Sequence, residues 1–159
     1  MPTPTRAART VAGVQDEAAE VAARLRLSAT RLARRLRQEA GTGLTPSQLS
    51  ALATVHNHGP LTLGALAERE QVAPPSITKV VTKLEADGLL QRSPDPTDRR
   101  VSHVRTTAAG AELVDESRRR KTAWLTDRIH ELADGERDRL AAALDVLDRL
   151  IAFEQQDPT

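Results

Sequence analysis

The sequence VAPPSITKVVTKLEADGLL, residues 72–90, has the pattern of a helix that is buried on one side. Wound at about 100° per residue, its apolar side chains fall in one narrow arc, formed by Ile77, Val80, Val81 and Leu84. Pro74 and Pro75 occupy a first turn, where proline is tolerated because those N–H groups have no intrahelical partner. Gly88 follows where a left-handed cap ends such a helix, so we expect about four turns.

The opposite arc of this helix interleaves short hydroxyls with cations, namely Ser76, Thr78, Lys79, Thr82 and Lys83. Serine and threonine can bond phosphate or base edges, and lysine neutralises phosphate or reads guanine. This composition favours a helix that reads DNA. The alternative is an ordinary amphipathic surface helix whose polar face is only solvated.

The segments before this helix complete a helix-turn-helix pattern. Thr45-Pro46-Ser47-Gln48 has the sequence of a helix start, with threonine as N-cap and glutamine placed for a capping box. That helix ends in the turn His58-Gly59-Pro60, and Thr62 can cap a second short helix. Two short helices followed at once by a longer helix with a polar face have the spacing of a helix-turn-helix.

The residues after Gly88 change to a strand pattern. Residues 89–93 predict a short strand, residues 94–100 a turn-rich loop and residues 101–106 a returning strand. The tip of this hairpin holds Asp98, Arg99 and Arg100. A hairpin in this place can reach a minor groove, and arginine suits that narrow, negative groove. Residues 45–106 therefore form the predicted DNA-binding domain.

Long amphipathic segments flank this domain. Residues 1–13 lack periodicity and predict a disordered tail, whereas residues 14–44 predict a helix. Residues 107–159 predict two helices, the first capped by Thr107 and separated from the second at Asp134-Gly135-Glu136. The second helix carries a coiled-coil-like seam at a 4-3-4 step, formed by Leu140, Leu144, Leu147 and Ile151. We expect these flanking helices to form a homodimer; the alternative is packing within one chain.

Length and composition exclude several classes of protein. At 159 residues, the chain is expected to be one domain or one domain with an appendage. It contains no cysteine, which excludes disulfides, thiolate catalysis and cysteine-based zinc sites. No apolar run of about 18 residues and no cationic leader occur, so we expect a cytoplasmic protein without a membrane partner.

Charge is distributed unevenly although the net charge is only +1. Residues 1–106 hold 15 Lys and Arg against 10 Asp and Glu, whereas residues 107–159 hold 8 against 12. A basic N-terminal part and an acidic C-terminal part are expected when the first binds phosphate and the second binds protein. The chain has one tryptophan, one phenylalanine and no tyrosine, so it lacks a platform for stacking unpaired bases. The expected nucleic-acid partner is therefore double-stranded.

Over residues 15–153 the sequence resembles the MarR family of bacterial transcriptional regulators. The resemblance lies in LTPSQLSALATV, in LTLGALAEREQVAPPSITKVVTKLEADGLLQR and in DPTDRRVSHVRTTAAGAELV, where an Asp-x-Arg wing precedes Thr107-x-x-Gly110. It implies a mainly α fold with a small β-hairpin wing, in which long N- and C-terminal dimerisation helices flank a winged helix-turn-helix domain. It also implies a homodimeric protein, usually a repressor, that binds pseudo-palindromic operators.

The resemblance assigns roles to particular residues. It implies that Pro75, Ser76, Thr78, Lys79, Thr82 and Lys83 lie in the major groove. Arg100 would be the minor-groove residue of the wing, with Asp98 orienting its guanidinium. Arg92 and Arg99 would add to the neutralisation of phosphate. The chain departs from the family pattern at Ala73, where an N-cap hydroxyl is common, and at Glu70-Gln71, where an apolar-Gly turn is usual.

No catalytic constellation is present, and we expect neither enzyme activity, nor a metal, nor a cofactor. His56 and His58 lie about 200° apart on a helix, so they cannot share one metal. The family implies a small-molecule effector pocket between dimerisation helices and winged domain, whose candidate lining here is Arg24, Arg31, His56 and Trp124. Alternatively, His56 is a core residue, Trp124 is a core or interface anchor, and repression needs no effector. The competing function is a winged-helix module that binds protein instead of specific DNA.

Overall fold

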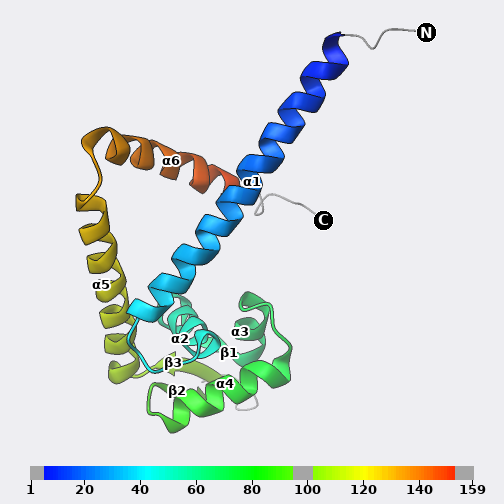
Figure 1. The fold of residues 1–159 in the computed structure, drawn as a ribbon. Coiled ribbons are helices and arrows are strands. Elements are labelled where there is room, and N and C mark those ends of the chain that lie inside the picture. Colours follow the sequence, from blue (N-terminus) through cyan, green and yellow to red (C-terminus); the bar gives the residue numbers. More distant parts are fainter. Residues whose placement is uncertain (1–5, 95–101, 153–159) are drawn as a thin grey trace. The chain divides into compact units, whose positions relative to one another are not determined.

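The computed structural model describes residues 6–94 and 102–152, which hold six helices and three strands (Figure 1). The helices are α1 (Arg6–Glu39), α2 (Pro46–His58), α3 (Leu63–Arg69), α4 (Pro74–Ala86), α5 (Ala108–His130) and α6 (Asp134–Ala152). The strands are β1 (Leu61–Thr62), β2 (Leu90–Pro94) and β3 (Ser102–Thr106). This architecture confirms the predicted mainly α fold with a small β-hairpin.

The described residues divide into two compact units between Ser117 and Arg118. The first unit therefore includes the start of α5, although residues from Thr107 onward are predicted to belong to the C-terminal dimerisation helices. The physical reason is that Gly110 and Val114 are buried, and Val114 belongs to the main hydrophobic core.

The sheet is antiparallel with the order β1-β3-β2. Strands β2 and β3 form the predicted hairpin, in which Leu90 pairs with Thr106 and Arg92 with Val104. The third strand, β1, was not predicted; it pairs Leu61 with Val104. Two residues are too few for a strand pattern, and the partner of β1 is more than 40 positions away along the chain.

The core of the first unit lies between α2, α3, α4 and the sheet. Its fully buried side chains include Leu52, Leu66, Leu84, Val81 and Val104. The apolar arc predicted for α4 is confirmed, because Ile77, Val81 and Leu84 are buried and Val80 packs against the cluster. Burial of this arc fixes which side of α4 remains exposed.

The predicted helix signals at the two short helices are confirmed. Thr45 and Gln48 form a complete capping box at the start of α2, where the Thr45 N–H donates to Gln48 Oε1 at 2.8 Å. Thr62 caps α3 by accepting a hydrogen bond from the Ala65 N–H at 3.1 Å.

Helix α4 ends in a Schellman motif at Gly88, which has a φ of 71°. The Leu89 N–H donates to the Leu84 carbonyl, and the Gly88 N–H donates to the Glu85 carbonyl, both at 2.9 Å. This termination turns the chain from α4 directly into β2.

Two boundaries differ from the sequence-based expectations. Helix α1 begins at Arg6, so it includes residues 6–13 of the predicted disordered tail. Alanine and arginine favour a helix there even without a strong apolar period. Helix α5 ends at His130, and Asp134, Gly135 and Glu136 form the first turn of α6 instead of the break.

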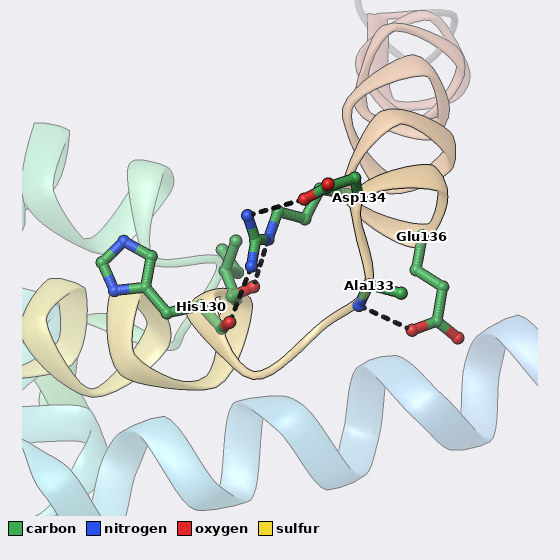
Figure 2. A network of polar contacts seen from close by, with 6 residues as sticks. His130, Ala133, Asp134 and Glu136 are labelled. Atoms are coloured by element: carbon green, nitrogen blue, oxygen red, sulfur yellow. Dashed lines mark hydrogen bonds and ion pairs between the residues drawn. The ribbon is translucent and has the colours of Figure 1, made fainter.

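The turn between α5 and α6 is held by polar contacts that explain this second difference (Figure 2). Glu136 at the third position of α6 accepts the Ala133 N–H at 3.1 Å, which is half of a capping box. Arg137 donates to the carbonyls of Ile129 and His130 and pairs with Asp134. These bonds satisfy the last carbonyls of α5 and move the start of α6 to Asp134.

Candidate nucleic-acid interface

The six residues proposed for the major groove all lie on the exposed side of α4. They are Pro75, Ser76, Thr78, Lys79, Thr82 and Lys83, and each is solvent-exposed. The buried residues Ile77, Val81 and Leu84 hold the opposite side against the core. The structure therefore brings these six residues together on one accessible face, as the helical period requires.

Acidic partners hold two of the cations near this face. Lys83 Nζ lies 2.6 Å from Asp87 Oδ1, and Arg92 Nε lies 3.1 Å from Glu85 Oε2. Exposed pairs of this kind contribute little stability, so a phosphate can compete for these cations. Lys79 makes no ion pair with any residue in the described part of the chain.

The Glu85–Arg92 pair was not predicted, and it links α4 to the first strand of the hairpin. The contact is an ion pair between Nε of the Arg92 guanidinium and Oε2 of the Glu85 carboxylate. Seven positions separate these residues, and no helical period joins them because the chain turns at Gly88.

The tip of the hairpin lies outside the described residues. Asp98, Arg99 and Arg100 all belong to that segment, so their proposed roles remain predictions. The described part of the hairpin ends at Pro94 and resumes at Ser102, which are paired partners.

The turn that leads into α4 has an unusual residue in a left-handed conformation. Gln71 has a φ of 53°, the position at which glycine commonly ends a helix. The Val72 N–H donates to the Ala67 carbonyl and the Gln71 N–H to the Glu68 carbonyl, which completes a Schellman motif after α3. Glu70 accepts a hydrogen bond from the Thr54 hydroxyl of α2. The Glu70-Gln71 pair therefore forms a Schellman turn, and the backbone strain lies at the left-handed Gln71.

Helix α4 begins without a side-chain cap, as Ala73 implies. The Ala73 side chain accepts no hydrogen bond, and Pro74 and Pro75 occupy the first two helical positions. The positions of the two prolines agree with the prediction, and the preset φ of proline favours a helix start there.

Within the described part of the chain, the structure gives no hydrogen bond, ion pair or shared hollow that links the four candidate effector residues to one another. Arg24 and Arg31 are exposed on α1. His56 Nε2 lies 3.4 Å from Asp115 Oδ1, and its side chain is 22% exposed, which agrees with a partly buried residue. Trp124 belongs to the second unit, where the Arg128 guanidinium lies 5.8 Å from its ring centre. The effector pocket therefore remains a prediction.

Neither of two hollows lined by described residues contains a candidate effector residue. One hollow of about 230 Å³ lies between the end of α1 and the start of α2, and the other follows one side of α5. Within residues 6–94 and 102–152, no group of three His, Asp or Glu could hold a metal ion. No helix in these ranges is both apolar and long enough to cross a membrane.

The predicted dimer seam on α6 is largely uncovered in the single chain. Leu140 is 38% exposed, Leu144 is 52% and Ile151 is 65%, while Leu147 is half-buried. Helix α1 likewise exposes Val21, Leu25, Leu27 and Leu32. The exposure of these side chains does not identify what covers them, so the dimer interface remains a prediction.

Comparison with known proteins gives matches to the winged helix-turn-helix segment and to most of the chain. The sequence model of the MarR family matches residues 44–102, which run from just before α2 to the first residue of β3. An HTH-type transcriptional regulator of Mycobacterium bovis is 42% identical over 137 residues, or 86% of this chain and 96% of that protein. The HTH-type transcriptional repressor MdtR of Bacillus subtilis is 38% identical over 68 residues, or 43% of this chain and 44% of that protein.

Solved structures resemble the chain over most of its length. A crystal structure of a protein from Pseudomonas aeruginosa is 31% identical with a TM-score of 0.76, covering 86% of this chain and 97% of that one. A MarR family protein from Bacillus stearothermophilus is 25% identical with a TM-score of 0.75, covering 87% and 97%.

Proposed function

The chain belongs to the MarR family of DNA-binding transcriptional regulators, and from that premise we propose that it is a homodimeric repressor of a pseudo-palindromic operator. The observation that supports this most is the exposed face of α4, where hydroxyls and lysines stand opposite a buried apolar arc. Side chains of this kind bond base edges and phosphates in a major groove.

In the proposed complex, two copies of α4 enter successive major grooves about 34 Å apart on one side of the duplex. Arg100 of each wing reaches the flanking minor groove. Lys79, Lys83, Arg92 and Arg99 neutralise phosphates, which makes affinity fall steeply with salt. Repression would follow from occlusion, because a dimer that covers two turns of DNA excludes other proteins from the same site.

Homodimerisation through α1 and the seam on α6 is part of this proposal. The exposed leucines and Ile151 of these helices support it, since burying them against a second copy removes apolar area from water. The repressor role has support from the relative MdtR, whose name describes a repressor. An effector bound near Arg24, Arg31, His56 and Trp124 would act by favouring a dimer with the wrong separation of the two α4 helices.

The proposal is tested by fluorescence-anisotropy titration of the full chain against the DNA upstream of its own gene. A scrambled duplex of equal length and composition serves as the control, and both titrations are repeated across a salt series. We expect saturable binding that prefers the native duplex, with a steep salt slope. Equal, weak binding to both duplexes would contradict the proposal and favour the protein-binding module.

Lys79 provides a sharper version of this test. If it contacts a phosphate, Lys79→Ala should lower the slope of log affinity against log salt by about one for each half-site. Lys121→Ala in α5 is a matched control that removes the same charge far along the sequence from α4. An unchanged slope for Lys79→Ala would remove this lysine from the interface.

A further inference from the structure

An exposed apolar run of four residues leads into α4 and includes its first two positions. Val72, Ala73, Pro74 and Pro75 are all exposed, and Val72 is 41% accessible to solvent. Four consecutive apolar residues on a surface are unfavourable unless they contact something. These residues lie at the start of the proposed DNA-reading helix, so the group that they would contact is a DNA base.

The same turn has lost the hydrogen-bond donors that a helix start ordinarily presents. Pro74 and Pro75 carry no N–H, and the N–H groups of Ser76 and Ile77 donate to the Ala73 carbonyl at 2.9 and 3.3 Å. The Thr78 hydroxyl donates to the Pro74 carbonyl at 2.9 Å. This helix start therefore cannot hold a phosphate on backbone amides, as many helix starts do.

Helical geometry places Pro75 in the middle of the exposed face. At about 100° per residue, the buried residues Ile77, Val81 and Leu84 centre on one direction, and Pro75 and Lys79 lie nearly opposite to it. The face thus presents an apolar ring at its start and an ammonium group one turn later. These two surfaces suit different chemical groups of the DNA.

We infer that Pro75 is a specificity-determining residue that reads the 5-methyl group of a thymine in each half-site. Thymine alone among the four bases presents a methyl group in the major groove, and apolar side chains recognise it by contact. Residues at the start of a recognition helix are those that reach base edges. The inference deepens the proposed function and rests on it, because α4 must occupy the major groove.

The test first selects duplexes from a random 30-base-pair library with the full wild-type chain. Each thymine of an enriched duplex is then replaced, one at a time, by deoxyuridine, which lacks only the methyl group. At one position per half-site we expect wild-type affinity to fall about fourfold, the effect of losing one buried methyl contact. Replacing both half-sites should cost about sixteenfold.

A matched set of variants assigns that contact to Pro75. Pro75→Ala and Pro75→Gly both restore a backbone N–H, but only alanine keeps an apolar group. We expect Pro75→Ala to retain part of the preference for thymine over uracil and Pro75→Gly to lose it. Pro74→Gly makes the same backbone change one residue earlier and should keep the preference.

The outcomes separate this inference from the proposed function. Enrichment of a duplex without any difference between thymine and uracil would overturn the inference and leave the DNA-binding role intact. A thymine preference that persists in Pro75→Gly would also overturn it, because another residue would then read the methyl group. Failure to enrich any duplex would overturn the proposed function and the inference together.

Discussion

Replacing Gly110 by alanine should destabilise the first unit, because α5 approaches the α4–β2 junction at this glycine. A Cβ atom there would lie 2.1 Å from the Leu89 carbonyl oxygen and 3.3 Å from Leu52 Cδ1. Ordinary contacts begin at 3.4 Å, so the backbone must move by about 1.3 Å, the difference between 3.4 and 2.1 Å. The obstacle is a backbone carbonyl, which no side-chain rotation can remove.

The magnitude follows from the bonds that this movement disturbs. The Thr107 N–H donates to the Leu89 carbonyl at 3.1 Å, and the Thr107 hydroxyl donates to the Gly88 carbonyl at 2.7 Å. Losing these two bonds costs about 1 kcal/mol each, and over-packing costs about 2 kcal/mol more. Alanine returns about 1 kcal/mol through its higher helix propensity. The free energy of unfolding should therefore fall by about 3 kcal/mol, which lowers Tm by about 6–12 °C in a chain of this size.

Thermal unfolding followed by far-ultraviolet circular dichroism measures this change on the full chain. Gly64→Ala in α3 is the matched control, because a Cβ there meets nothing closer than Thr62 Oγ1 at 3.9 Å. It should leave Tm unchanged or raise it slightly, since alanine is the better helix former. A Gly110→Ala variant that unfolds at the wild-type Tm would refute the close approach of α5 to Leu89.

Three further changes test other parts of the structure. Gln71→Gly should raise Tm by about 1–4 °C, because glycine adopts a φ of 53° without the strain that glutamine bears, and a lower Tm would contradict the left-handed turn. Leu144→Asp combined with Leu147→Asp should give monomers in sedimentation equilibrium, and a well-folded dimer would place the interface elsewhere. Arg100→Ala should weaken operator binding by about 10-fold or more in anisotropy titrations while the dimer persists. Unchanged affinity would exclude the wing tip from the mechanism.

Features set by neighbours along the chain could be predicted from the sequence. The capping box of Thr45 and Gln48, the proline start of α4 and the left-handed Gly88 all depend on contacts within about five positions. Such contacts form wherever the local sequence permits them, so the residue types alone indicate them. The exposed face of α4 followed in the same way, because a 3.6-residue period fixes which side chains share a face.

The short strand β1 and the ion pairs could not be predicted in this way. Leu61 meets Val104, Glu85 meets Arg92 across a turn, and His56 meets Asp115. The residue types at these positions are compatible with many partners. Only the folded chain chooses between them, because the choice depends on where separate elements come to lie.

The sequence by itself determined the order of the helices and the hairpin, the caps at Thr45, Thr62 and Gly88, and the face of α4 that stays exposed, because each depends on local geometry. The tertiary structure alone decided that Gly110 lies against Leu89, that Glu85 restrains Arg92 and that β1 joins the hairpin. Those contacts join elements through a shared core. Packing at near-crystalline density admits few arrangements of such a core, and no local pattern encodes which one forms.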